Sequence, residues 1–325
     1  MQSISSKALL LSAFLSFSGI GGVKGQTFSD FVDRIGLNNL DVAVDMGSTG
    51  IGFQVGTMVT PWMQVRTGFD YMPYFEKDMS FTIQIGDHVE SKFDPDGNRV
   101  ETTFDRMAGY MKEITGLDVD DEVIMVGTPS FNNAKLIFDV FPIRNCGWYL
   151  SAGVYAGRKV IGHAVNRIEE MPSLMAVGIY NNMYEKTVNE EPIFMGVELP
   201  PALADKVIDA GRMGIHVGDY VSDGTSYVME PNNESMVTAD MKVNAFRPYV
   251  GTGYKGQFSE RNEHLKFAVD GGVFFWGGVP KVYLHDGTEL TQDLTNIMGQ
   301  VDRYVQLVKK FPVFPVLNLS LVYSF

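Results

Sequence analysis

The chain has 325 residues, of which 45% are hydrophobic, with a formal net charge of −13 and a single cysteine, Cys146. The acidic balance argues against nucleic acid as a partner, since nucleic-acid-binding domains carry clustered positive charge. One cysteine cannot form an internal disulfide, and no segment approaches the roughly 20 consecutive apolar residues of a transmembrane helix.

The first 25 residues predict a signal peptide. Lys7 precedes the apolar residues 8–17, and Val23-Lys24-Gly25 offers small side chains at the positions before a cleavage site. An apolar run of this length is too short to span a bilayer, so we expect cleavage and not a signal anchor. The mature protein would then consist of residues 26–325.

Eight later segments alternate apolar and polar residues. This pattern predicts β-strands, because successive side chains of a strand point to opposite faces of a sheet. In the sixth segment the apolar positions change phase, which predicts a bulge near Ala245 and Phe246. The segments are residues 40–46, 50–58, 63–71, 135–141, 148–157, 240–254, 265–276 and 317–325.

The last segment carries the strongest signal. Leu317, Leu319, Leu321, Tyr323 and Phe325 share one face, while the other face is mostly polar. An exposed edge of this kind would aggregate in water, so we expect the face to meet lipid and the edges to be paired by closure into a barrel. The segment resembles the C-terminal strand of Gram-negative outer-membrane barrels, which implies that the barrel-assembly machinery recognises residues 317–325.

The lengths of the connections predict the orientation. They are short after the second, fourth and sixth segments and long after the third, fifth and seventh, as in outer-membrane barrels. The predicted fold is therefore an all-β, closed antiparallel transmembrane β-barrel of eight strands with both termini periplasmic. Ten strands are the alternative if residues 213–221 and 226–229 reach lipid instead of forming a hairpin beyond the membrane. The extracellular inserts would be residues 74–133, 158–238 and 279–311.

Helical spacing of apolar residues occurs within these inserts. A first stripe starts near Thr103, a possible cap, and stops before Gly116, and a second spans residues 200–210. A third stripe spans residues 290–310. We expect these helices to pack within a cap over the barrel mouth. The apolar residues of the first stripe are Phe104, Met107, Met111 and Ile114.

Several fragments resemble a family of uncharacterised Gram-negative outer-membrane barrels. They occur in the same order as in that family and cover about half of the chain. The resemblance implies the barrel fold and transfers no activity. The inserts 74–133 and 158–238 are longer than the family pattern. The fragments are Val65–Pro73, Phe138–Pro142, Leu150–Tyr155, Arg247–Gly253 and Val279–Val282.

The inward positions of the predicted strands carry charges of both signs. An eight-stranded barrel is only wide enough for side chains to fill, so we expect a salt-bridge network that plugs the lumen. Arg66 should neutralise Asp41 or Asp45, because an unpaired buried charge is costly. A narrow porin is the alternative and would require an aqueous gap. The predicted network comprises Asp41, Asp45, Arg66, Asp70, Lys135, Asp139, Arg247, Lys266 and Asp270.

Two motifs have ligand-binding spacing. Asp94, Asp96 and Asn98 are weak candidates for calcium, but Arg99 stands where an EF-hand loop needs glycine, and a Pro-Asp-Gly turn explains the residues more simply. Residues 251–256 match the glycine spacing of a dinucleotide-binding loop. That loop requires a following helix, which is not predicted, so we expect no cofactor.

A second alternative is a lipid hydrolase or acyltransferase. Such an enzyme would need a histidine beside a hydroxyl at the membrane boundary, and His163 with Ser173, His216 and His285 are the candidates. No Gly-x-Ser-x-Gly motif occurs, so we expect a non-catalytic structural or surface-binding role.

The expected surroundings are outer-membrane lipid and lipopolysaccharide. Amphipathic aromatic side chains settle at membrane–water interfaces, and five of them lie near the ends of predicted strands. The predicted interface anchors are Trp62, Trp148, Trp276, Tyr323 and Phe325.

Overall fold

The computed structural model describes residues 40–86, 90–193, 198–259, 262–297, 302–303, 305–306, 310 and 312–325. The predicted signal peptide, residues 1–25, lies outside the described residues.

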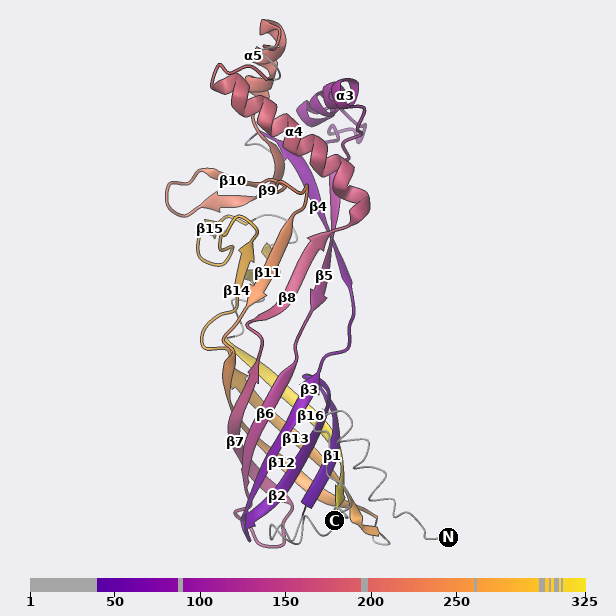
Figure 1. The fold of residues 1–325 in the computed structure, drawn as a ribbon, viewed down its shortest axis with the longest axis vertical. Coiled ribbons are helices and arrows are strands. Elements are labelled where there is room, and N and C mark those ends of the chain that lie inside the picture. Colours follow the sequence, from indigo (N-terminus) through magenta and orange to yellow (C-terminus); the bar gives the residue numbers. More distant parts are fainter. Residues whose placement is uncertain are drawn as a thin grey trace, which may run out of the picture.

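The lower part of the molecule is a closed eight-stranded antiparallel β-barrel (Figure 1). The first and last strands pair along their length, for example through Val44 and Leu321, and this pairing closes the barrel. The predicted eight-stranded barrel is therefore confirmed, and the ten-stranded alternative is wrong. The strand order is β1 (Leu40–Gly47), β16 (Val313–Ser324), β13 (Asn262–Phe275), β12 (Phe246–Ser259), β7 (Trp148–Gly157), β6 (Asn133–Val140), β3 (Met63–Tyr71) and β2 (Gly50–Thr60).

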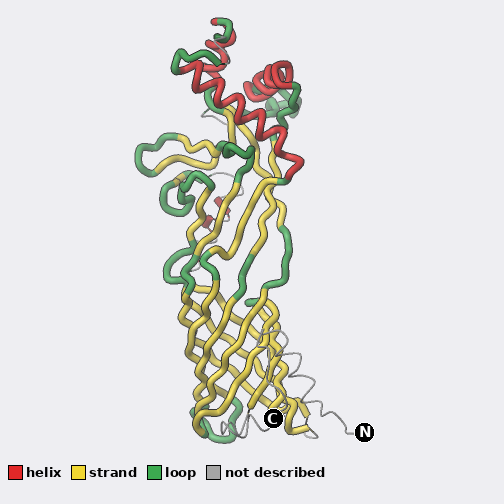
Figure 2. Tube along the Cα trace, viewed as in Figure 1, coloured by secondary structure: helices red, strands yellow, loops and turns green. Residues whose placement is uncertain are grey.

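A second antiparallel sheet stands above the barrel (Figure 2). The predicted hairpin of residues 213–221 and 226–229 is part of it, since β9 pairs with β10. We call it the outer sheet. Its strands are β10 (Ser226–Met229), β9 (Met213–Tyr220), β4 (Lys77–Ile85), β5 (Glu122–Pro129), β8 (Val160–Asn166), β11 (Thr238–Lys242) and β14 (Lys281–Leu284), in that order, and β15 (Leu294–Thr295) pairs with β9.

The outer sheet continues one side of the barrel. The order β4-β5-β8-β11-β14 repeats the order β3-β6-β7-β12-β13 of the barrel strands to which these strands are joined. The strands β16, β1 and β2 have no counterpart in the outer sheet. We call the barrel end next to the outer sheet the rim, and the end that carries Phe325 and the turn at residues 61–62 the base.

The predicted single strand at residues 240–254 is in fact two strands, β11 and β12. The predicted bulge at Ala245 and Phe246 is wrong, because the register shift falls between Met241 and Lys242, where β11 pairs with β8. Residues 239–249 keep one alternation, with Met241 and Val243 on the same side as the lumen-facing Tyr249. Inside the barrel the inward residues are mostly polar and the outward residues apolar, whereas above the barrel the residues on the inward side are apolar. The apolar positions therefore change phase although the chain keeps its alternation.

Two predicted helices are confirmed with small changes. The helix α3 (Thr103–Thr115) is capped by Thr102, and not Thr103, through a capping box with Asp105, and it ends at the left-handed Gly116. Phe104, Met107 and Met111 are buried as predicted, whereas Ile114 is 57% exposed. The helix α5 (Pro201–Ala210) matches the predicted residues 200–210.

The predicted helix at residues 290–310 is wrong for its first part. Leu290 donates its N–H to the Val282 carbonyl, and Leu294 lies in β15, so strand pairing replaces the helix there. Residues 302–303, 305–306 and 310 are helical, and the rest of that stretch lies outside the described residues.

The helix α4 (Met171–Val188) has no sequence prediction. Its apolar residues surround the helix without a stripe, and no side chain caps its N-terminus, so neither periodicity nor a capping motif indicates it. Figure 1 shows α3, α4 and α5 at the end of the molecule farthest from the barrel.

The barrel exposes an apolar outer surface, as the alternation predicts. We call this surface the belt, and single side chains in it are as much as 67% exposed. The belt comprises Val44, Met46, Ile51, Phe53, Phe69, Leu136, Phe138, Leu150, Val250, Leu317, Leu319 and Leu321.

Glycines make room for large side chains inside the barrel. A Cβ atom at Gly253 would lie 2.4 Å from the ring of Tyr149, and one at Gly251 would lie 2.2 Å from the hydroxyl of Tyr249. The glycine motif at residues 251–256 therefore belongs to a barrel strand and accommodates tyrosine rings.

We predict that Gly253→Val destabilises the barrel by about 1–3 kcal/mol, since overpacking forces Tyr149 out of its position. The temperature at which the purified protein loses its folded form on SDS gels should fall. The matched control is Val250→Leu on the outer face of the same strand, which should leave that temperature unchanged. Equal temperatures for the two variants would contradict this packing.

Candidate functional site

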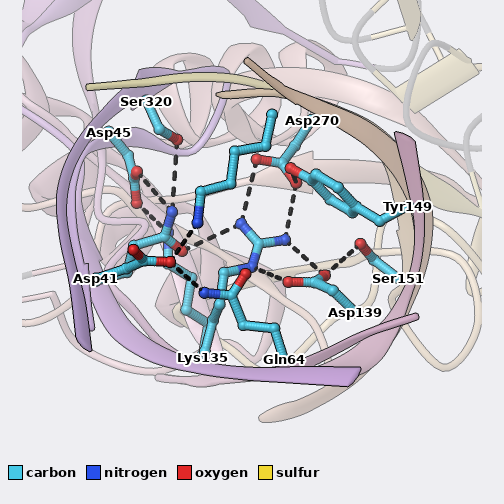
Figure 3. A network of polar contacts seen from close by, with 12 residues as sticks. Asp41, Asp45, Gln64, Lys135, Asp139, Tyr149, Ser151, Asp270 and Ser320 are labelled. Carbon is cyan, nitrogen blue, oxygen red and sulfur yellow. Dashed lines mark hydrogen bonds and ion pairs between the residues drawn. The ribbon is translucent and has the colours of Figure 1, made fainter. Parts of the chain in front are cut away.

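Arg66 is the centre of an ion cluster inside the barrel, and Figure 3 labels its partners Asp139 and Asp270. Its guanidinium lies 2.5 Å from a carboxylate oxygen of Asp139 and 2.8 Å from one of Asp270. The hydroxyl of Tyr149 donates to Asp270 at 2.9 Å, and that of Ser151 donates to Asp139 at 2.6 Å. These residues come from strands β3, β6, β7 and β13, so the cluster crosses the lumen.

A second cation lies beside this cluster. The ammonium of Lys135 is 2.6 Å from Asp45 and 2.6 Å from Asp70, and its side chain is 2% exposed. The amide of Gln54 donates to Asp45 at 3.0 Å and accepts from Arg66 at 3.3 Å. Gln54 therefore joins the two ion clusters into one network.

A third cation occupies the base side of the network. Lys255 forms an ion pair with Asp41, which also accepts hydrogen bonds from Gln64 and Ser324. Lys255 has no sequence prediction, because the predicted strand stopped at Tyr254. Extending the alternation by one residue would have placed Lys255 inward.

The predicted partners of Arg66 are wrong. Asp41 and Asp45 are neutralised by Lys255 and Lys135, because strand tilt brings those lysines to their level across the lumen. Lys266 was predicted in the network, but its side chain forms no hydrogen bond or ion pair within the described residues.

Arg247 is buried, as predicted, but it lies at the rim and outside the charge network. It donates to the carbonyls of Asn244 and Arg158 and to the side chain of Asn133. Its guanidinium lies 5.0 Å from the centre of the Phe131 ring, an arrangement that stabilises a cation.

An aromatic cluster fills the rim end of the lumen. Phe274 is fully buried, and its ring centre lies 4.9 Å from that of Phe314 and 5.1 Å from that of Trp276. Trp276 is only 7% exposed, so its predicted role as an interface anchor is wrong. Its even number places it on the inward face with Asp270, and the aromatic cluster holds it there. The cluster comprises Phe131, Tyr155, Tyr249, Phe274, Trp276 and Phe314.

These two layers leave almost no space inside the barrel. A cavity of about 20 Å³ lies beside Asp41, Arg66 and Lys255, and the space around Lys135 and Asp270 holds no further volume for water. A single water needs roughly 10–15 Å³ of such volume. The described barrel is therefore filled by side chains.

An apolar cavity lies in the outer sheet. It has a volume of about 400 Å³ and lies on the face that continues the lumen-facing side of the barrel. Small residues form its floor, since Gly127, Ala164 and Ala239 follow one another across three paired strands, and the larger Leu284 ends the row on β14. Methionines and a phenylalanine surround this floor, namely Met79, Phe81, Met125, Met229 and Met241.

The segment after β14 folds back beside that strand, where Leu290 donates its N–H to the Val282 carbonyl and lines the cavity. Glu289 holds the segment in place, because it accepts from Lys281 at 2.9 Å and from the Tyr283 hydroxyl at 3.0 Å. Burial raises the pKa of Glu289, but these hydrogen bonds outweigh burial and lower it. Sequence reasoning missed the cavity, because its residues come from separate segments.

The calcium candidates form a turn. One carboxylate oxygen of Asp94 accepts the backbone N–H groups of Asp96 and Asn98 at 2.9 and 2.8 Å. The hydrogen bond from Asn98 lowers the pKa of Asp94. The carboxylate thus stabilises its own loop, and within the described residues no group of three or more histidine, cysteine, aspartate or glutamate side chains lies close enough to hold a metal ion.

The candidate catalytic residues are not brought together. His163 contacts Asp240 at 2.7 Å, whereas the Ser173 hydroxyl bonds to the backbone of Asp118 and Asp120. Neither ring nitrogen of His216 has a hydrogen-bond partner, and Nδ1 of His285 has none within the described residues.

The other predicted anchors lie near the base. Trp62 is 54% exposed in the turn between β2 and β3, and Trp148 is 37% exposed at the start of β7. Tyr323 and Phe325 are half-buried at the end of β16, with ring centres 5.0 Å apart.

None of the described helices is both long enough and apolar enough to cross a bilayer. Comparison with protein-family models finds no match, and comparison with curated proteins finds none either.

Comparison with solved structures finds outer-membrane proteins. CarO2 and CarO of Acinetobacter baumannii are 14% and 12% identical, with TM-scores of 0.37, and each alignment covers 88% of this chain and 98% or 97% of the other. A major outer membrane protein of Thermus thermophilus is 13% identical, with a TM-score of 0.28 over 88% of this chain and 98% of the other. At these scores the likeness carries no argument, and the barrel topology rests on its own strand pairing.

We predict that Arg66→Met costs about 3–5 kcal/mol of stability, because it leaves two buried carboxylates without their cation. The double variant Arg66→Met/Asp270→Asn should lose less than the sum of the single losses, since the two groups interact. Urea unfolding from lipid vesicles, followed by tryptophan emission, measures both values. The matched control Lys266→Met should stay within about 0.5 kcal/mol, and strict additivity of the two substitutions would contradict the ion pair.

Proposed function

We propose that the barrel spans the bacterial outer membrane as a non-conducting anchor that holds the outer sheet at the cell surface in a non-catalytic binding role. The observation that carries the proposal is the combination of the exposed apolar belt with a lumen filled by charged and aromatic side chains. A closed barrel satisfies every backbone group internally, which lipid requires.

Basic residues just above the rim support contact with lipopolysaccharide. Arg158 and Lys159 join β7 to β8, and Lys242 ends β11 opposite Val160. None of the three forms an ion pair with a carboxylate within the described residues. Their charges are placed to meet anionic head groups at the membrane surface, although the chain as a whole is acidic.

The base carries the features expected of the periplasmic end. Its turns at residues 61–62 and 141–147 are short, and Phe325 donates its N–H to the Leu40 carbonyl at 2.9 Å. Both ends of the described barrel therefore meet at the base. The strand that ends at Phe325 offers the exposed residues Leu317, Leu319 and Leu321 to the barrel-assembly machinery.

We predict that an impermeant maleimide does not label Cys146 on intact cells, because Cys146 lies in a turn at the base. Labelling should appear after the outer membrane is permeabilised. The matched variant Cys146→Ser/Asp205→Cys places the thiol at an exposed position of α5 and should react on intact cells. Labelling of both proteins on intact cells, or of neither, would contradict the orientation.

We also predict that the purified protein produces no conductance steps in planar bilayers, because the lumen has no continuous aqueous path. The variant Arg66→Gly/Tyr149→Gly removes the two largest side chains of the central layer and serves as the positive control for insertion. Its small steps should contrast with the silent native protein. Regular steps from the native protein would support the narrow porin and refute the anchor.

A further inference from the structure

We propose that the apolar cavity of the outer sheet binds the alkyl chain of a fatty-acid-class amphiphile, with its anionic head group at Lys77. The inference rests on the proposed function in that it names the ligand of the surface-binding role. The cavity has a volume of about 400 Å³, which falls within the roughly 300–1,000 Å³ of small-molecule sites.

The lining favours a flexible hydrocarbon over a rigid or polar ligand. Four methionines, Met79, Met125, Met229 and Met241, surround the cavity, and their unbranched side chains adapt to chains of different shape. Polar groups are scarce in the lining, so a ligand with many hydrogen-bonding groups would lose its hydration without replacement.

The floor has the shape that a linear chain requires. Gly127, Ala164 and Ala239 lie next to one another on three paired strands, and Gly162 lies opposite Pro129 and Met241 in the adjacent row. Because the glycines and alanines of these rows have small side chains, the sheet face is hollow between the larger residues of β4 and those of β14. The hollow runs across the strands.

The two ends of the cavity differ in polarity. At β14 the row ends with the apolar Leu284, which pairs with Ala239, and at β4 it ends with Lys77, which pairs with Gly127. Lys77 lies on β4, which pairs only with β5 over residues 77–82. The structure gives Lys77 no ion pair within the described residues, so its ammonium can receive a carboxylate. His163, the other ionisable group of the lining, contacts Asp240 at 2.7 Å.

The edge of the cavity at β14 is held in place by bonds outside the cavity. Glu289 binds Lys281 and Tyr283, and the Tyr227 hydroxyl donates to Asp286 at 2.7 Å. These bonds fix the segment beside β14, where Leu290 lines the cavity, so this edge of the site is formed before a ligand arrives. A preformed apolar site loses little ordering entropy on binding.

The test uses the full protein in phosphatidylcholine nanodiscs with a dodecanoate probe that carries a diazirine on its alkyl chain. After irradiation, mass spectrometry should find saturable labelling of peptides that contain Met79, Met125 or Met241. Excess dodecanoate should remove this labelling, and octanoate should compete less well, by about fourfold for each missing methylene. Labelling of belt peptides such as residues 317–321 should persist under both competitors.

Variants separate the cavity from the rest of the surface. Ala239→Phe fills the floor and should reduce saturable labelling at least tenfold, whereas Ser80→Phe, on the opposite face of β4, should not change it. Lys77→Glu should weaken competition by dodecanoate about tenfold and leave competition by dodecanol unchanged. Equal labelling of Ala239→Phe and the native protein, or no saturable labelling of the native protein, would overturn the proposal.

A second probe identifies the source of the chain. Nanodiscs made with a diazirine-bearing phosphatidylcholine should label the belt and not the cavity. Labelling of the cavity by this lipid would refute a free fatty acid as the occupant. The maleimide and conductance experiments test the anchor separately, so failure of one proposal is distinguishable from failure of the other.

Discussion

The narrow lumen is the constraint on which the rest of the structure depends. An eight-stranded barrel turns one side of every strand into a space that side chains alone must fill, and any charge placed there must find its partner there. Arg66 meets this requirement for Asp139 and Asp270, and Lys135 does so for Asp45 and Asp70. The ion cluster joins strands from both sides of the barrel and replaces the apolar core of a soluble protein.

The face that lines the lumen continues into the outer sheet, and its side chains change in character from the base to the outer sheet. Inside the barrel it is charged, at the rim it is aromatic around Phe274, and in the outer sheet it is aliphatic around Ala164 and Ala239. The residues that lead from β5 to β6 and from β11 to β12 keep their alternation through these changes. A single strand direction can therefore carry a plug below and a cavity above.

This arrangement divides the molecule into parts with different roles. The belt and the filled lumen suit the anchor that we propose, and the outer sheet contains the apolar cavity that we propose as the ligand site. Only five barrel strands, β3, β6, β7, β12 and β13, are joined to strands of the outer sheet. At the edge strand β14 the cavity is bounded by the segment that follows, which Glu289 ties to Lys281. A rigid barrel thus positions a site that its own lumen has no room to contain.

Alternation along single strands was enough to predict the barrel and most inward charges, such as Arg66 and Lys135, because a period of two depends only on neighbouring residues. It also led to errors where the surroundings changed. Trp276 occupies an inward position in the alternation, yet a tryptophan near a strand end suggested the membrane interface. The change of phase at residues 240–254 suggested a bulge that is absent at Ala245 and Phe246.

The sequence by itself determined which residues face the inside of the barrel and which form its apolar exterior. Only the tertiary structure decided which charges pair, that the inserts form a sheet, and that a cavity lies within it. Pairing across the lumen depends on strand tilt and register, which bring Lys255 to Asp41 from 214 residues away along the chain. The cavity, likewise, exists because residues of seven separate strands and residues between them, such as Leu290, meet in space.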